Sequence, residues 1–321
     1  MFEMDSDRYS DQSDEQGAEN LVCRPIEARN STLRDMTPSH IHGYFEREGP
    51  GGGLIMDETK ETRSSLRQLE FLAANLPPRD LDILRDIEAR RYMTSGQIRR
   101  LRFWDASTPG SAQRIANRVT SRLKGHGLIF PLDRRIGGVR GGSGENVWAL
   151  TPSGFRLLRL DDSNLPRKRG FEPSRRFEEH TLAIAELDVQ LRSIAGVTVT
   201  QAQFEPACWR EYNGRRLKPD YFTVTVSGNY EDFWFFEIDL ATESPSQVVA
   251  KCEQYQDYYR SGVEQRATGI FPRVVWVTLN SKRRESIERH IRASRTLRQK
   301  DLFLVILPNE LDPTIRRGAA L

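Results

Sequence analysis

The sequence predicts a mixed α/β protein of two domains that follow a polar N-terminal region. Between residues 79 and 160, helical hydrophobic periodicity gives way to two short apolar strands around a glycine-rich segment. After residue 196, apolar strands alternate with helices, which is typical of a mixed sheet. Charge is divided in the same way. Residues 1–62 are acidic, with 14 Asp/Glu and 6 Lys/Arg. Residues 79–160 are basic, with 7 Asp/Glu and 16 Lys/Arg, and residues 161–321 are nearly neutral, with 23 Asp/Glu and 24 Lys/Arg.

The composition excludes several classes of protein. Hydrophobic residues make up 37% and charged residues 29%, which suits a core with solvated extensions. No apolar run approaches the roughly 18 residues of a membrane span, and the N-terminus lacks the apolar segment of a secretion signal. Cys23, Cys208 and Cys252 have no metal-ligand spacing, which favours free thiols in a reducing compartment. We therefore expect a cytoplasmic protein without a membrane partner.

Residues 1–62 are acidic, polar and without a sustained hydrophobic period. A glycine-rich break at Gly49–Gly53 interrupts any regular element there. This composition predicts disorder, because too little apolar surface is available to form a core. The region is interpreted either as a solubilising tail or as a segment that competes with a polyanion for the basic surface.

The first domain is predicted over residues 63–162. Its expected helices cover residues 64–76, 79–87, 96–103, 111–124 and 151–160, with Tyr92-Met93 extended. Two strands, 128–132 and 147–150, flank a glycine-rich tip at 137–146. After the N-terminal helix, three helices followed by a hairpin give the element order of a winged helix-turn-helix domain, with residues 111–124 as the recognition helix.

This domain is predicted to bind double-stranded DNA, because its basic excess falls on the recognition helix and the wing. The outward side chains are of the types that reach phosphates and base edges. The candidates are Gln113, Arg114, Asn117, Arg118, Ser121 and Arg122 on the helix, with Arg134, Arg135 and Arg140 on the wing. The alternative is a winged helix that contacts protein, with its arginines solvated.

A basic linker with prolines is predicted at residues 163–175, and the second domain at 176–321. The expected helices are 176–194, 246–259 and 281–297. The expected strands are 197–205, 217–226, 233–240, 273–278 and 302–307. Their order predicts an α/β domain with a mixed sheet.

Three carboxylates interrupt the apolar pattern of this domain. Asp220 begins one strand, and Glu237 and Asp239 end the next. Side chains two residues apart on a strand share a face, and hairpin pairing brings Asp220 to the same end. Carboxylates near a sheet core are costly unless a cation or hydrogen-bond donor compensates them.

The run Pro219-Asp220, a hairpin, Glu237-Ile238-Asp239 and a helix resembles the restriction-endonuclease-like fold of the PD-(D/E)xK nucleases. The resemblance implies that Asp220 and Glu237 bind Mg²⁺. The family's lysine is replaced by Asp239, and Lys251 on the following helix is the candidate substitute. These four residues are the candidate catalytic set of a Mg²⁺-dependent nuclease or nickase. The alternative is a structural core in which Lys218, Arg215 or Lys251 pairs with the carboxylates.

A longer set of motifs resembles the replication-relaxation family. These motifs are Leu76–Leu81, Val147–Gly154, Glu179–Leu187, Lys218–Asp220, Glu237–Asp239 and Lys251–Tyr255. The resemblance implies a bacterial DNA-binding protein that acts in replication, relaxation or transfer of a plasmid or other mobile element. Replication or mobilisation proteins are then possible partners. The alternatives are the nuclease, and an adaptor or transcriptional regulator with a degenerate nuclease scaffold.

Overall fold

The computed structural model describes residues 23–25, 64–136, 145–160 and 174–319. Most of the predicted disordered head, the wing tip with Arg140 and most of the predicted linker lie outside these residues. The fold is mixed α/β, as predicted. The chain divides into an N-terminal unit, residues 31–196 and 203–207, and a C-terminal unit, residues 1–30, 197–202 and 208–321. Within the described ranges, no helix is long and apolar enough to cross a membrane.

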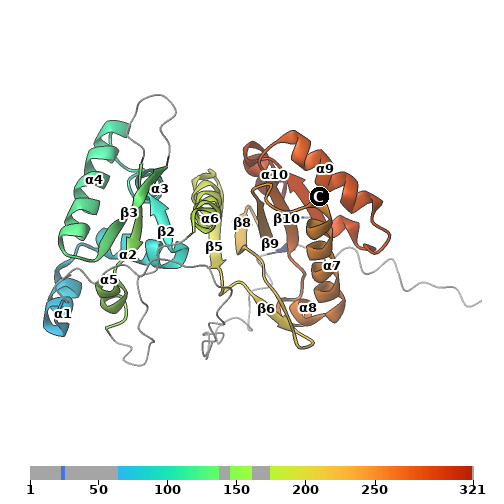
Figure 1. Cartoon of the computed structure of the whole chain (residues 1–321), viewed down its shortest axis with the longest axis horizontal. Coiled ribbons are helices and arrows are strands. Elements are labelled where there is room, and N and C mark those ends of the chain that lie inside the picture. The colour runs from blue at the N-terminus through green and yellow to red at the C-terminus, as the bar shows by residue number, and fades with distance from the viewer. Residues whose placement is uncertain (1–22, 26–63, 137–144, 161–173, 320–321) are drawn as a thin grey trace, which may run out of the picture. The chain divides into compact units, whose positions relative to one another are not determined.

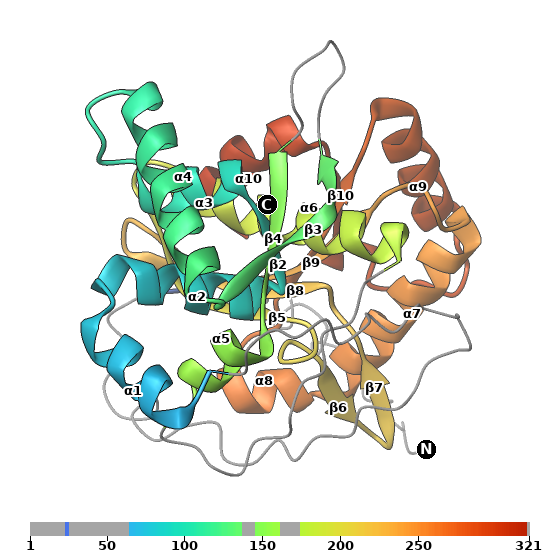
Figure 2. The ribbon, with the colours of Figure 1, turned by 60° about the vertical axis from the view of Figure 1, so that its left-hand side comes forward.

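The N-terminal unit combines helices with an antiparallel sheet of order β2-β4-β3 (Figures 1 and 2). Its helices are α1 (Leu66–Asn75), α2 (Pro78–Arg90), α3 (Ser95–Arg102), α4 (Pro109–Gly125), α5 (Pro152–Leu157) and α6 (Arg175–Ser193). Its strands are β2 (Tyr92–Thr94), β3 (Ile129–Ile136) and β4 (Glu145–Leu150). The core packs the apolar faces of the helices against the sheet, with Leu84, Leu123 and Trp148 buried in one cluster.

Helix α4 begins earlier than the sequence pattern predicted. Thr108, rather than Ser111, is the N-cap, and its hydroxyl accepts a hydrogen bond from the Ser111 N–H at 3.1 Å. Ser111 completes a capping box by accepting from the Thr108 N–H. Pro109 occupies the first turn, where its missing N–H costs nothing and its fixed φ suits a helix. The Pro109-Gly110 pair therefore starts the helix instead of forming a loop before it.

Helix α6 was predicted in the second domain, but it belongs to the N-terminal unit. Its Val189 joins the cluster of α2, α3 and α4, and its Leu182 packs with Tyr92 and Val147. The Gln97 side chain also donates to the Leu182 carbonyl at 3.1 Å. The expected domain boundary at residue 175 is therefore wrong, because α6 buries its apolar face on α3 and the β2-β4-β3 sheet.

The C-terminal unit is built on a mixed sheet of order β11-β10-β9-β8-β5. The strands of this unit are β1 (Cys23–Pro25), β5 (Val197–Phe204), β6 (Arg210–Tyr212), β7 (Arg215–Leu217), β8 (Tyr221–Ser227), β9 (Tyr230–Asp239), β10 (Arg273–Thr278) and β11 (Phe303–Ile306). β6 and β7 pair with each other in a separate two-stranded sheet. β8 is antiparallel to β9, whereas β10 is parallel to both β9 and β11. β1 pairs antiparallel with the start of β9, which corrects the expected disorder at these three residues.

Helices α7 (Pro245–Ser261) and α9 (Ser281–Ala293) lie side by side over one face of this sheet (Figure 1). Shorter helices follow: α8 (Val263–Thr268), α10 (Leu311–Arg317) and single turns at Lys300–Leu302 and Pro308–Glu310. Phe235, Tyr255 and Ile287 meet in the core between sheet and helices. α9 ends at Ala293, four residues before the predicted end, because Ser294 leaves the helical conformation.

Candidate nucleic-acid interface and carboxylate cluster

Helix α4 has one buried and one exposed face. Ala116, Val119 and Leu123 are buried in the core of the N-terminal unit. The predicted DNA-contacting residues on the other face are exposed at Arg114, Asn117, Arg118 and Ser121. Gln113 is half-buried, and its Nε2 donates to the side-chain Oδ1 of Asn117 at 2.9 Å. The helix therefore presents two arginines, an amide pair and a hydroxyl to solvent.

Arg122 does not share this exposed position. Its Nε and Nη2 donate to both Asp80 oxygens at 2.7–2.9 Å. The Asp80 side chain is 2% exposed, so this bidentate pair fastens α4 to the first turn of α2. Arg122 is thus placed to hold the helix rather than to reach a partner. Arg134 and Arg135 lie on β3, but the structure does not describe their side chains, and Arg140 lies outside the described residues.

Trp104, in the turn between α3 and α4, was missed by the sequence reasoning. Its side chain is 81% exposed, whereas the neighbouring Phe103 is 2% exposed. The Arg79 guanidinium lies 5.3 Å from the Phe103 ring centre and pairs with Asp105 at 2.8 Å. The turn is therefore held in place while the indole projects into solvent. An isolated tryptophan before a polar turn gives no sequence signal that separates an exposed from a buried side chain.

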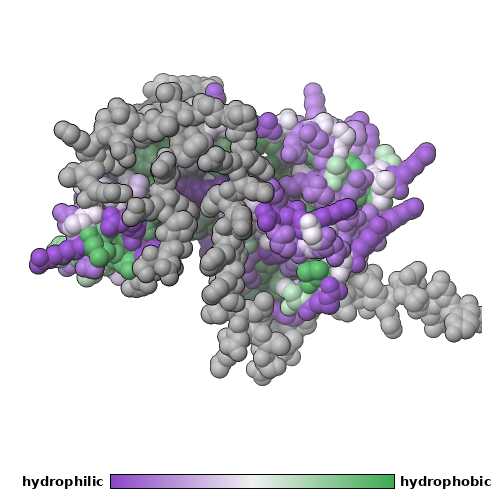
Figure 3. Space-filling view, turned by 60° about the horizontal axis from the view of Figure 1, so that its bottom comes forward, coloured by the Kyte–Doolittle hydropathy of each residue, from purple (hydrophilic) through white to green (hydrophobic). Residues whose placement is uncertain are grey.

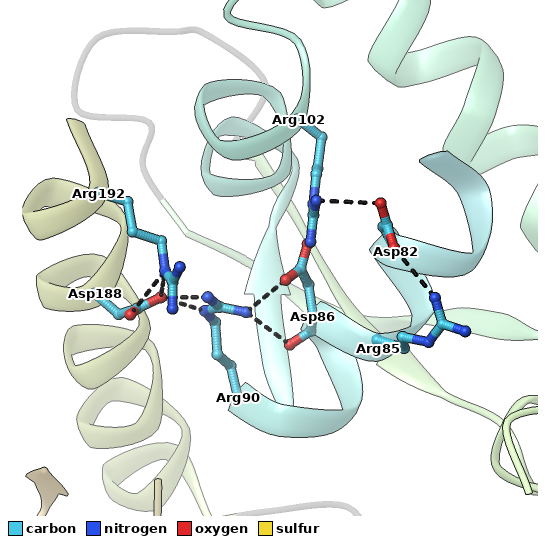
Figure 4. A network of polar contacts seen from close by, with 7 residues as sticks. All are labelled: Asp82, Arg85, Asp86, Arg90, Arg102, Asp188 and Arg192. Atoms are coloured by element: carbon cyan, nitrogen blue, oxygen red, sulfur yellow. Dashed lines mark hydrogen bonds and ion pairs between the residues drawn. The ribbon is translucent and has the colours of Figure 1, made fainter. Parts of the chain in front are cut away.

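A buried network of ion pairs joins α2, α3 and α6 (Figure 4). Arg90, 4% exposed, donates to Asp188 at 2.9 Å and to Asp86 at 2.9 Å. Arg102 also pairs with Asp86, and Arg192 donates to Asp188 at 3.0 Å. These charges are neutralised internally, so they fix the helices that support α4 and are not available to a partner.

Glu186 on α6 neutralises a further arginine of α3. Arg100 pairs with it, with Nη1 2.7 Å from Oε1, and Gln97 donates to it at 3.3 Å. Burial by itself raises the pKa of Glu186, but the hydrogen bonds from Arg100, Gln190 and Gln97 and the Arg100 charge lower it overall. Among the described residues, Arg114 and Arg118 have no such ion pair.

In the C-terminal unit, Asp220, Glu237 and Lys251 lie together. Pairing of β8 with β9 brings the two carboxylates close, as predicted, and α7 supplies the lysine. The Asp220 Oδ2 accepts a hydrogen bond from the Ile238 N–H at 2.7 Å. The Lys251 ammonium on α7 lies 3.7 Å from Asp220 Oδ1 and donates to Glu237 Oε2. The Tyr255 hydroxyl, one helical turn further, donates to Glu237 Oε1. Both carboxylates are nearly inaccessible, with Asp220 6% and Glu237 1% exposed.

Asp239 has a different partner from the other two carboxylates. Its oxygens accept from Arg283 Nε and Nη2 at 2.6 and 2.7 Å, a bidentate pair with the first turn of α9. Of the three candidate cations, Arg215 pairs with Asp257 at 3.2 Å, and the Lys218 ammonium lies over the Trp209 ring. Lys251 contacts both Asp220 and Glu237.

A sequence model of the replication-relaxation family matches residues 84–274. The chain belongs to the replication-relaxation family. The matched region contains α4 and the Asp220–Glu237–Lys251 cluster, and begins within α2. Comparison with curated proteins and with solved structures found no match. Family membership connects the protein with replication or relaxation of a plasmid or other mobile element.

The electrostatics of the cluster in this replication-relaxation protein follow from its burial. Burial raises the pKa of Glu237 well above its usual range, and the Lys251 charge opposes this effect. Burial also disfavours the charged form of Lys251, but the Glu237 and Asp220 charges outweigh it and raise the lysine pKa. The ammonium therefore carries its charge and is shared between Asp220 and Glu237.

The cluster has the oxygen atoms that Mg²⁺ prefers but leaves little room for the ion. Hard carboxylate oxygens suit Mg²⁺, which usually keeps several of its waters when it binds. Both Glu237 oxygens already accept protein donors, Asp220 Oδ2 accepts the Ile238 N–H, and both Asp239 oxygens accept Arg283. Within the part of the chain that the structure describes, no group of three or more His, Cys, Asp or Glu side chains is placed to hold a metal. In this arrangement the cluster does not fit a hydrated metal.

Proposed function

We propose that the protein binds double-stranded DNA in the replication, relaxation or transfer of a plasmid or other mobile element. The order α2-β2-α3-α4-β3-β4, with strand order β2-β4-β3, supports a winged helix-turn-helix domain. In such domains the last helix before the hairpin enters the major groove. α4 would be that recognition helix.

The observation that carries this proposal is the selective neutralisation of arginines. Arg90, Arg100, Arg102 and Arg122 are all paired with carboxylates of the same unit. Arg114 and Arg118 are exposed, four residues apart on one face of α4, and have no carboxylate partner among the described residues. The phosphate backbone of a duplex would supply the counter-charge that these two side chains lack among the described residues.

The proposal is tested with the full-length protein carrying Arg114→Ala and Arg118→Ala. Binding to a duplex is measured by fluorescence anisotropy at several salt concentrations. Each phosphate that the variant no longer neutralises should reduce the slope of log K against log salt by about 0.9, so the double variant should show a reduction of up to about 1.8. The matched control removes the exposed Arg67 and Arg156, which lie on α1 and α5. An unchanged slope in a folded α4 variant would overturn the assignment of α4.

A second candidate, a Mg²⁺-dependent nuclease or nickase, is favoured by the convergence of Asp220, Glu237 and Lys251. The carboxylates are buried and their oxygens already accept hydrogen bonds from the protein, which argues for binding without cleavage. Supercoiled plasmid with Mg²⁺ separates the two, because cleavage by wild type that is abolished in Asp220→Ala would select the nuclease. Binding without cleavage selects the DNA-binding protein, and neither activity selects the adaptor.

A further inference from the structure

We propose that α9 and the segment that follows it, residues 294–300, form a second surface for the phosphate backbone of duplex DNA. We refer to residues 281–300 as the α9 surface. This inference rests on the proposed function in taking DNA as the partner, but it concerns the C-terminal unit and none of the α4 residues. The face of the C-terminal unit that Figure 3 shows is mostly hydrophilic.

The α9 surface is strongly basic, although the C-terminal half of the chain is nearly neutral as a whole. Residues 281–300 hold eight Lys or Arg and two Glu, a net charge of +6. Ile287 and Ile291 are buried against the core of the unit, so the charged face of α9 points outward. The exposed cations are Lys282, Arg289, Arg292, Arg295 and Arg298.

Some cations of the α9 surface have carboxylate partners and others do not. Arg283 pairs with Asp239, and Arg284 with Glu310 at 2.7 Å. Arg292 lies 3.4 Å from Glu288 on the same helix. The described residues provide no carboxylate partner within ion-pair distance for Lys282, Arg289, Arg295 and Arg298. These four side chains are therefore the ones that a polyanion would neutralise.

Helix stability does not explain this distribution of charge. Cations near the C-terminus of a helix are favourable, because they oppose the negative end of the helix dipole. The first turn of α9, however, contains Lys282, Arg283 and Arg284 and no acidic residue. Cations there face the positive end of the dipole and reduce helix stability. Arg283 is offset by Asp239, but the exposed Lys282 is not, which points to an external anion.

The spacing of the cations suits a duplex. Lys282 and Arg289 are seven residues apart and share one face of the helix, separated by about 10 Å along its axis. A duplex presents about six phosphates over that length. Arg295 and Arg298 extend the positive surface beyond the end of α9 at Ala293. The α9 surface therefore matches a linear array of negative charge better than a single small anion.

The segment that carries Arg295 and Arg298 is held in a fixed conformation. The buried Gln256 of α7 donates to the Thr296 carbonyl at 3.1 Å and accepts from the Arg298 and Gln299 N–H groups. Leu297 is 2% exposed and anchors the segment in the core. Because the backbone is already ordered, the entropy cost of binding falls mainly on the arginine side chains.

The bidentate Asp239–Arg283 pair positions the other end of the α9 surface. It ties the first turn of α9 to the last residue of β9, and Arg283 also donates to the Glu243 carbonyl at 2.7 Å. Asp239 would then be a positioning residue for the helix rather than a metal ligand. This role gives a reason for an aspartate at the place where the nuclease pattern has a lysine.

The test uses the full-length protein and a random-sequence duplex, with affinity measured by anisotropy as a function of salt. The α9 variant replaces Lys282, Arg289, Arg295 and Arg298 by Ala. The control variant makes the same change of charge at exposed arginines elsewhere in the unit, Arg260, Arg266, Arg316 and Arg317. We expect the α9 variant to reduce the salt slope by about 2 to 4, at about 0.9 for each phosphate that is no longer neutralised, and the control by clearly less. Equal melting temperatures show that both variants are folded.

The outcomes separate this inference from the proposed function. If wild type binds no duplex, both proposals fall. If Arg114→Ala with Arg118→Ala weakens binding while the α9 variant matches its control, only the α9 surface is overturned. If the α9 variant reduces the slope further in the Arg114→Ala, Arg118→Ala background, the two surfaces act independently, as we infer. Binding of wild type to phosphatidylserine vesicles that is abolished in the α9 variant, with DNA binding intact, would instead assign this surface to a membrane and overturn the inference.

Discussion

At the scale of single residues, chemically similar side chains have different roles because their neighbours differ. Glu237 and Asp239 are two residues apart on β9, yet one accepts from Lys251 and Tyr255 and the other from Arg283. Arg118 and Arg122 are likewise one turn apart on α4, but Arg122 alone is paired with Asp80. Distance along the sequence therefore does not decide whether a charge supports the fold or faces a partner.

Arg122 should contribute to stability rather than directly to DNA binding. Arg122→Ala leaves the buried Asp80 carboxylate without its bidentate donor, so we expect a decrease of about 1–3 kcal/mol in the free energy of unfolding. Arg118→Ala, on the exposed face, should change it by less than about 0.5 kcal/mol. Urea denaturation of both variants provides the measurement. Equal stabilities for the two would contradict the structural role of Arg122.

The carboxylate cluster should respond little to Mg²⁺ in the wild-type protein, because both Glu237 oxygens and Asp220 Oδ2 already accept hydrogen bonds and the two carboxylates are buried. Millimolar Mg²⁺ should leave the melting temperature unchanged. Lys251→Met removes the cation while keeping a similar length, and two uncompensated carboxylates should then gain stability from Mg²⁺ by mass action. A thermal-shift titration of both proteins provides the comparison. A wild-type melting temperature that rises with Mg²⁺ would show that the metal displaces Lys251, and would favour the nuclease.

At the scale of secondary-structure elements, α6 organises the N-terminal unit through charge as well as apolar packing. Its Asp188 and Glu186 accept from arginines of α2 and α3, and its Leu182 and Val189 enter the apolar clusters. α6 thereby neutralises Arg90 of α2 and Arg100 of α3. The exposed Arg114 and Arg118 of α4, by contrast, have no carboxylate partner among the described residues.

The Glu186–Arg100 pair should make the stability of this unit sensitive to acid. The pKa of Glu186 is lowered in the folded protein, so its contribution is present above the unfolded-state pKa, about 4.5. It disappears as the pH falls through the lower pKa of the folded state. We expect Glu186→Gln to lose less stability than wild type between pH 6 and pH 3, measured by urea denaturation at each pH. Glu70→Gln, at an exposed position on α1, is the control and should behave like wild type.

At the scale of the whole molecule, the division into units differs from the one that composition suggested. The basic, proline-containing stretch was expected to separate the domains, but α6 follows it and packs with the N-terminal unit. We predict that a fragment of residues 64–196 folds cooperatively, whereas a fragment of residues 64–174 does not, because it exposes the surface that α6 covers. Circular dichroism with thermal melting distinguishes them. A cooperative transition in the shorter fragment would contradict this division.

Much of the fold was predictable because it depends on local periodicity. The helical spacing of Ile115, Val119 and Leu123 and the apolar runs at 233–240 and 273–278 identified elements that the structure contains. The hairpin of β6 and β7 and the short strand β1 were missed. Their strands are three residues long, too short for a period to be recognised, and they are stabilised by pairing with other strands.

The sequence by itself determined the order of the main elements, the nearness of Asp220 to Glu237, and the family. It also determined the outward positions of Arg114, Asn117, Arg118 and Ser121 on α4. Each of these depends on the fixed periods of helix and strand or on motifs that are contiguous in the chain. Only the tertiary structure decided that Arg122 is bound to Asp80, that Asp239 belongs with Arg283, and that α6 supports the N-terminal unit. An ion pair depends on the direction and reach of side chains from elements far apart in the sequence, and no local pattern encodes that geometry.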